Sequence, residues 1–239
     1  MRLIKVDNDP EPSLIDEKLS SLKLNIFHLA LFLSVASLIT PKQVHAQTSA
    51  NIGINSNYLW RGITQSDKNF AASAGLKYAS ESGFYLGTWV STMTGGSYEL
   101  DLYGGFSNEV NGTSYDIGIL SYQYPNDDDY FNEIYASVSR VGVTAAIAYT
   151  IDSKNDASPV FSQGDLYLSL AYGKELSNGL ALDATIGRYN FDDILGDDYS
   201  HLNLSAALAD FTLALDTTTG LTSSNDTTLS LAWSKTFKF

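Results

Sequence analysis

His201 is the residue of this chain best suited to acid–base chemistry. Asn203 and Ser205 follow it at alternate positions, and a serine, a histidine and an asparagine can together hydrolyse an ester when they are hydrogen-bonded. Residues i and i+4 of one extended strand lie about 13 Å apart. Ser205 is therefore too far from His201, and a serine from a neighbouring strand would be needed. We predict that His201 is a polar structural residue and that the chain is not an enzyme.

Metal chemistry has few possible ligands in this sequence. The chain has no cysteine and three histidines, of which His28 and His45 lie in the N-terminal 46 residues. Acidic residues crowd at 126–130 ("NDDDY") and 191–199 ("FDDILGDDY"), but neither stretch has the oxygen spacing of a calcium-binding loop. We interpret both as solvated loops, with weak divalent-cation binding as the alternative, and we predict no metal site and no cofactor.

The elements that must position these residues are β-strands. Apolar and small or polar residues alternate along the chain after residue 50, as in 164–175, where Leu166, Leu168, Leu170 and Tyr172 occupy one face. A period of two residues is typical of strands. Twelve such segments can be read: 50–62, 69–80, 83–93, 97–108, 112–124, 130–140, 142–152, 164–175, 179–190, 198–208, 211–218 and 226–239.

The connections between these segments alternate in character. Those after the even-numbered segments are tight ("SESG", "EVNG", "RVG", "LSNG", "AD"), whereas most of the others are longer and polar. Short turns at one end and longer loops at the other are typical of an outer-membrane barrel. An even number of strands also lets both chain ends meet on one side, and closure removes the unpaired edges that lipid cannot satisfy.

The alternative to a barrel is a secreted β-sandwich, whose apolar face would point inward. Two features favour the barrel. Charged residues are 17% of the chain and concentrate in the loops, while the polar face is rich in small residues. The chain also ends in "LSLAWSKTFKF", in which Trp233, Phe237 and the terminal Phe239 share one face and resemble the signal by which outer-membrane barrels are inserted. We predict an all-β, antiparallel, up-and-down transmembrane barrel of about twelve strands.

Aromatic residues lie mostly near the ends of these segments, as the aromatic girdles of a membrane barrel do. We assign to the girdles Tyr58, Trp60, Tyr78, Tyr85, Trp89, Tyr98, Tyr122, Tyr124, Tyr149, Tyr172, Tyr189, Tyr199 and Trp233. In the first segment, Tyr58 and Trp60 share a face with Ile52 and Ile54. They are therefore expected to anchor the top of that strand at the membrane interface, with Arg61 on the opposite face.

Residues 1–46 have the features of a cleaved secretory signal peptide. Lys18 and Lys23 precede the apolar run 24–40, and Val44 and Ala46 stand at the −3 and −1 positions of a cleavage site. A membrane anchor is the alternative. The segment contains five basic and five acidic residues, so the domain 47–239 keeps the net charge of −13 of the whole chain. Such an acidic domain is not expected to bind nucleic acid.

Three stretches together resemble the TorF-like family of porins (Gcw_chp), Gram-negative outer-membrane proteins. They are "SNYLWRGITQS" at 56–66, "SGFYLGTWVST" at 82–92 and "ELDLYGGF" at 99–106. Asn57 stands where the family pattern has aspartate. The residues that carry the match are Ser56, Tyr58, Arg61, Gly62, Gln65, Ser66, Gly83, Tyr85, Gly87 and Trp89. The resemblance implies a signal peptide, a barrel and a transport function.

The alternation places six carboxylates on the face opposite the apolar rows: Glu99, Asp101, Asp116, Glu133, Asp183 and Asp216. Arg61 and Arg140 are assigned to the same face. Charges are costly on a lipid face, so this face is expected to line the lumen. An open lumen would pass cations or neutral solutes passively, whereas in a plugged barrel Arg61 would neutralise one or two of the carboxylates.

Two functions follow from this interpretation. The first is a channel for small solutes, and the second is a structural barrel that holds cations or neighbouring lipid through its acidic loops. The expected partners are small solutes, outer-membrane lipid and lipopolysaccharide, and the barrel-assembly machinery. The expected location is the Gram-negative outer membrane.

Overall fold

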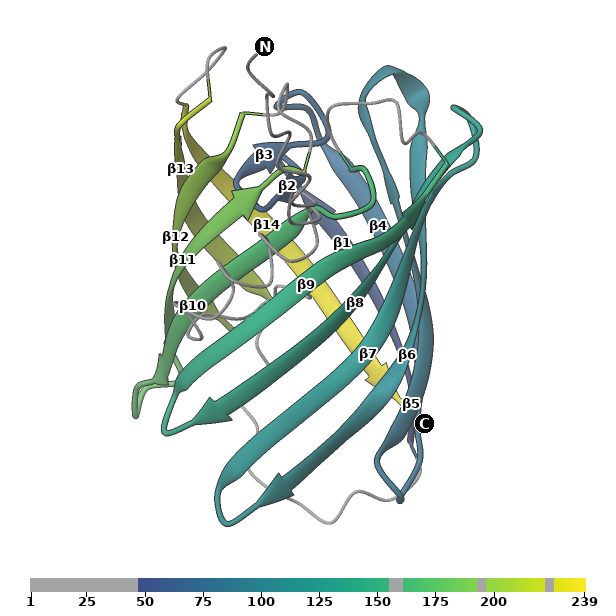
Figure 1. The fold of residues 1–239 in the computed structure, drawn as a ribbon. Helices are drawn as coiled ribbons and strands as arrows, with labels where there is room; N and C mark the ends of the chain where they lie inside the picture. Colours follow the sequence, from purple (N-terminus) through teal and green to yellow (C-terminus); the bar gives the residue numbers. More distant parts are fainter. Residues whose placement is uncertain (1–46, 155–160, 193–196, 222–225) are drawn as a thin grey trace, which may run out of the picture.

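The protein is a closed barrel of twelve antiparallel strands, seen in a computed structural model that describes residues 47–154, 161–192, 197–221 and 226–239 (Figure 1). Each strand pairs with its neighbours in sequence, and β1 closes the barrel by pairing with β14. The predicted fold is thereby confirmed. The signal peptide predicted at 1–46 lies outside the described residues. Within the described ranges, no helix has the length and hydropathy needed to span a membrane.

The barrel strands are β1 (Gln47–Asn55), β4 (Ala71–Ala79), β5 (Phe84–Thr92), β6 (Tyr98–Val110), β7 (Thr113–Tyr124), β8 (Asp129–Arg140), β9 (Val143–Ser153), β10 (Leu166–Glu175), β11 (Ala181–Asn190), β12 (Tyr199–Leu208), β13 (Phe211–Thr219) and β14 (Thr227–Lys238). A 3-10 turn, η1 (Thr94–Gly96), joins β5 to β6. The predicted strands agree with these bounds except at the first segment. Short turns lie at the end of the barrel where the C-terminus is found (Figure 1), which we call the short-turn end.

The outer wall is apolar because the alternating residues of every strand point to opposite faces. On β7, for example, Tyr115, Ile117 and Ile119 are about half exposed, whereas Leu120 and Tyr122 on the opposite face are buried. The large exposed hydrophobic side chains thus belong to the outside of the barrel. This inside-out arrangement suits a wall in contact with lipid.

Two neighbouring residues of β12 test this assignment. Leu204 is 43% exposed on the outer wall, and Ser205 is half-buried and faces the lumen. Leu204→Lys is expected to lower the free energy of unfolding in lipid vesicles by about 2–4 kcal/mol, because a charge near the bilayer midplane is poorly solvated. Ser205→Lys, the matched control, should have a much smaller effect in urea titrations. Equal effects of the two substitutions would contradict the assignment.

The chain between β1 and β4 departs from the prediction. The strand expected at 50–62 ends at Asn55, and the following residues form a separate two-stranded sheet of β2 (Leu59–Trp60) and β3 (Ile63–Thr64). We call residues 56–70 the inner segment, because its central side chains lie inside the barrel, whereas residues 67–70 are exposed. Tyr58 and Trp60 are buried there, 9% and 3% exposed. They are not interfacial anchors, so that prediction is wrong.

The hydrophobic core lies inside the barrel around this segment. Trp60 packs edge-on against Tyr122, Phe131 and Phe161, with ring centroids 5.9, 6.2 and 5.3 Å away. The assignment to the aromatic girdles is therefore wrong for eight residues, which face inward: Tyr58, Trp60, Tyr85, Trp89, Tyr122, Tyr124, Tyr189 and Tyr199. Tyr78, Tyr98, Tyr149 and Tyr172 do lie exposed on the outside.

Candidate functional site in the barrel lumen

The inner segment carries a tight hairpin whose tip is formed by Arg61 and Gly62. Both have positive φ, 47° and 84°, which a two-residue hairpin turn between Trp60 and Ile63 requires. Gly62 also lies very close to the wall. A Cβ atom at Gly62 would lie 2.7 Å from the Cβ of His201 and 2.9 Å from the Cγ2 of Thr218. Glycine is therefore needed both for the turn and for the close approach to β12 and β13.

Arg61 joins the tip of the hairpin to the opposite wall. Its guanidinium donates two hydrogen bonds to the Glu133 carboxylate of β8, with Nη1–Oε1 and Nη2–Oε2 distances of 2.8 and 2.6 Å. The guanidinium carbon also lies 4.3, 4.1 and 5.0 Å from the ring centres of Trp60, Tyr167 and Tyr189. Both charged side chains are almost fully buried. A paired and ring-stacked arginine is the form in which such a charge can be buried.

Further hydrogen bonds fix the inner segment near its base. The Tyr58 hydroxyl donates to Oε1 of Glu99 on β6 at 2.6 Å. The Ser66 hydroxyl accepts from the Tyr58 amide at 2.9 Å, and the Ser56 hydroxyl accepts from the amide of Leu231 on β14 at 2.9 Å. The inner segment is thus connected to β6, β8 and β14.

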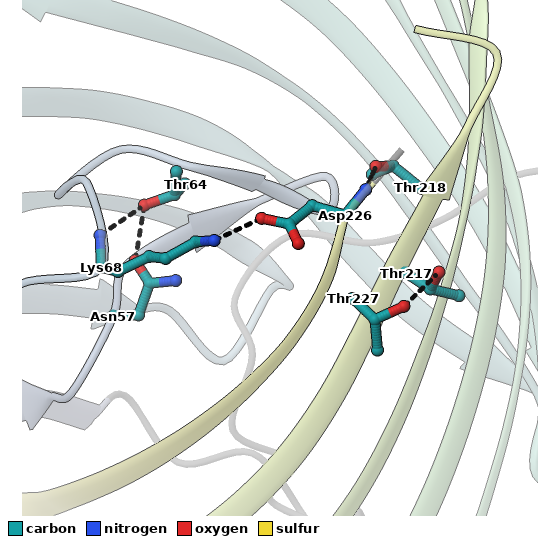
Figure 2. Close-up of polar contacts among 7 residues, drawn as sticks. All are labelled: Asn57, Thr64, Lys68, Thr217, Thr218, Asp226 and Thr227. Carbon is teal, nitrogen blue, oxygen red and sulfur yellow. Dashed lines mark hydrogen bonds and ion pairs between the residues drawn. The ribbon is translucent and has the colours of Figure 1, made fainter. Parts of the chain in front are cut away.

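An exposed ion pair connects the inner segment to the loop before β14. Figure 2 shows Lys68 extending to Asp226, whose amide donates to the Thr218 hydroxyl at 3.3 Å. In the same view, the Thr64 hydroxyl donates to Oδ1 of Asn57 and accepts from the Lys68 amide. The hydrogen bond and the charge of Lys68 hold the pKa of Asp226 below its ordinary value. Such an exposed pair contributes little to stability.

The six predicted lumen carboxylates differ in burial. Four are buried, namely Glu99, Asp101, Glu133 and Asp216, and of these Glu99 and Glu133 are hydrogen-bonded to the inner segment. Two others, Asp116 and Asp183, lie near the short-turn ends of β7 and β11 and are only half-buried. Since Asp116 and Asp183 point away from the outer wall, their exposed area faces the lumen. Side chains fill the barrel around the inner segment, whereas Asp116 and Asp183 keep part of their surface accessible inside the barrel toward the short-turn end.

A polar cluster lies inside the barrel toward the short-turn end. The Tyr85 hydroxyl donates to Asp116 and lies 2.5 Å from the Tyr135 hydroxyl. The ammonium of Lys77 lies 4.4 Å from the ring centre of Tyr85. These four side chains come from β4, β5, β7 and β8. They make this part of the lumen both charged and aromatic.

The two stretches of the sequence motif meet inside the barrel. The rings of Tyr58 and Trp89 are in edge contact, with centroids 5.4 Å apart. Gly87 lies under the ring of Tyr103, and Gly83 has a φ of 95° in the turn before β5. The Gln65 amide donates to the Tyr58 carbonyl at 2.7 Å. The motif residues thus build the inner segment and the wall against which it packs.

Other predicted residues lie away from this site. Arg140 is exposed at the end of β8, on the same face as Val138, and so does not face the lumen as expected. Trp233 and Phe237 lie on the outer wall of β14 and Phe239 is exposed at the chain end; their role as an insertion signal stays a prediction.

The hydrolytic trio is not assembled. Nε2 of His201 lies 2.8 Å from the Tyr167 hydroxyl, and Asn203 donates to Asp216 at 2.9 Å. No serine of the described part of the chain is hydrogen-bonded to His201. Among the described residues there is also no group of three or more His, Cys, Asp or Glu placed to hold a metal. The acidic stretch 191–199 includes 193–196, which lie outside the described residues.

The aromatic residues that surround Arg61 were not predicted to contact it. Tyr167 and Tyr189 contact its guanidinium, and Phe131 and Phe161 stack on each other with centroids 5.0 Å apart. The alternation along the strand could have shown that Tyr189 points inward, since Tyr189 falls on the same face as Asp183 and on the face opposite Ile186.

The barrel fold is similar to that of solved membrane proteins. The solved KdgM porin has a similar fold, with a TM-score of 0.50 and 8% identity over 81% of this chain and 99% of that chain. A structure from work on the in-meso crystallization of membrane proteins matches with a TM-score of 0.54 and 13% identity, over 82% of this chain and 84% of that chain. A comparison with curated proteins finds no match.

Residues 40–231 match the model of a family described as "Bacterial protein of unknown function (Gcw_chp)". The chain belongs to this Gcw_chp family. The narrower likeness to TorF-like porins stays a prediction from the motifs.

Proposed function

We propose that the protein is an outer-membrane channel for small solutes, whose passage is narrowed by the inner segment. The observation that carries this proposal is the contrast between the apolar outer wall and the charged side chains inside the barrel, of which Asp116 and Asp183 are only half-buried. The similar fold of the KdgM porin supports it. The acidic lumen favours cations or neutral molecules over anions. The signal peptide delivers the chain, and the assembly machinery inserts it among outer-membrane lipid and lipopolysaccharide.

Conductance across a planar bilayer tests this proposal. Purified, refolded protein is expected to give stepwise currents in KCl, with long closed periods because the inner segment fills the lumen between Glu99 and Glu133. Proteoliposomes should likewise release small neutral solutes more slowly than those of an open porin. The channel would be contradicted if protein with the circular dichroism of a β-barrel gave no current and released no solute.

A structural barrel without transport is the second candidate, and the burial of the Arg61–Glu133 pair favours it. In that case the inner segment would be a permanent plug that stiffens the wall. Wild-type protein would then give no current, and removing the segment would destabilise the barrel, whereas a channel conducts with the segment present.

A further inference from the structure

We propose that the inner segment is a gate. Its hydrogen-bond donors cover carboxylates of the barrel wall, and these carboxylates select cations when the gate is open. This inference rests on the proposed channel function. It adds which segment moves when the channel opens and which class of solute then passes. Glu99 accepts a hydrogen bond from Tyr58, and Glu133 accepts two from Arg61. The hairpin thus supplies donors to two buried carboxylates of the wall at the level where it fills the lumen.

The barrel wall is complete without the inner segment. Asn55 at the end of β1 and Ala71 at the start of β4 are direct register partners, so residues 56–70 begin and end at adjacent points of the wall. Inside the barrel, β2 and β3 pair with each other only through Leu59–Thr64 and Trp60–Ile63. The segment can therefore swing out as a loop while every strand pair of the barrel remains in place.

Opening would change the charge at the level of the hairpin. Arg61 and Tyr58 leave with the segment, while Glu99 and Glu133 stay on the wall without these two donors; Glu133 keeps the hydrogen bond that the Tyr122 hydroxyl of β7 donates at 3.3 Å. Asp101 lies two residues from Glu99 on the same face, and no hydrogen-bond partner is present for its buried Oδ1 among the described residues. Asp216 lies two residues from Thr218, which the hairpin approaches at Gly62.

The opened passage would therefore present four carboxylates at its narrowest level, namely Glu99, Asp101, Glu133 and Asp216. Lys77, a basic side chain that faces the lumen, lies farther toward the short-turn end. Rings of carboxylates attract cations and exclude anions. The class of solute that fits is a small cation or a cationic organic molecule, with neutral solutes passing more slowly.

Deletion of the gate tests both parts of the inference. Residues 57–69 are replaced by a short Gly-Ser turn between Ser56 and Phe70, and the reversal potential is measured across a planar bilayer with a KCl gradient. The deletion variant is expected to conduct continuously and to favour K⁺ over Cl⁻ roughly tenfold. Glu99→Gln/Glu133→Gln in the same background should bring this ratio toward unity. Glu81→Gln, in the turn between β4 and β5, is the control and should leave it unchanged.

The outcomes separate the gate, the filter and the channel. No current from either wild type or the deletion variant contradicts the channel itself. Equal, continuous currents from both contradict the gate. A larger current without cation preference, or a preference insensitive to the two glutamines, contradicts the filter while leaving the gate in place. If the deletion variant does not fold, the full-length Tyr58→Phe/Arg61→Met variant takes its place, with the same expected increase in current and cation preference.

Discussion

Replacing Arg61 by methionine is expected to release the hairpin from the barrel wall. The substitution leaves Glu133 buried without its cationic partner, and breaking a buried ion pair from one side costs about 3–5 kcal/mol. The ring contacts to Tyr167 and Tyr189 would lose their cation as well. Undocking of the hairpin relieves this cost because it returns Glu133 to water. The barrel should therefore stay folded when the Arg61–Glu133 pair is lost, while the inner segment is displaced.

Tryptophan emission measures this displacement. The chain has three tryptophans, so Trp89→Phe/Trp233→Phe leaves Trp60 as the sole reporter, and its emission should shift to the red in Arg61→Met. Adding Glu133→Gln should restore part of the wild-type emission, because a neutral buried amide is less costly than an unpaired carboxylate. Lys68→Met, which removes the exposed ion pair to Asp226, should leave the emission unchanged. An unshifted spectrum in Arg61→Met would show that the pair does not hold the hairpin.

Gly62→Ala is the second substitution with a large expected effect. An alanine at φ 84° is strained by about 1–2 kcal/mol. Its methyl group would also overlap His201 and Thr218 of the wall, and overpacking typically adds about 1–3 kcal/mol. The hairpin is thus expected to move away from β12 and β13, with a red shift of Trp60 emission in the same single-tryptophan background.

Gly179→Ala is the matched control for this substitution. Gly179 has nearly the same φ, 81°, but nothing lies within 4 Å of the position of its Cβ. It should show the backbone cost alone in urea unfolding, with unchanged Trp60 emission. Equal destabilisation by Gly62→Ala and Gly179→Ala, without a shift in emission, would mean that Gly62 does not pack against the wall.

Most of the barrel could be predicted from the sequence, because apolar residues recur at every second position along each strand of its outer wall. The same alternation led to a wrong prediction for the inner segment, as a continuation of the first strand. Tyr58 and Trp60 continue the parity of Ile52 and Ile54, so periodicity alone extends the strand past Asn55. The signal that stops it is local: Arg61-Gly62 forms a tight turn between Trp60 and Ile63, although Arg-Gly is a less familiar turn sequence than Asn-Gly.

The candidate site was predictable in its charges but not in its contacts. Parity placed Glu99, Asp101 and Glu133 on the lumen face, since each alternates with the apolar residues of the other face, such as Leu100 and Ile134. The partner of Arg61 could not be read in the same way. Arg61 and Glu133 are 72 residues apart, and their meeting depends on how far the hairpin folds into the barrel. Packing of Trp60 among aromatic rings sets that depth.

The pairing of Asn55 with Ala71 has a consequence for how this chain can change. Because the cylinder closes without residues 56–70, mutations in that stretch are constrained by fit to the cavity and not by the hydrogen-bond ladder of the wall. The wall and the contents of the barrel can then vary independently. One barrel sequence can accept inserts of different length or charge between these two positions, and each insert would give the proposed channel a different bore and ionic preference.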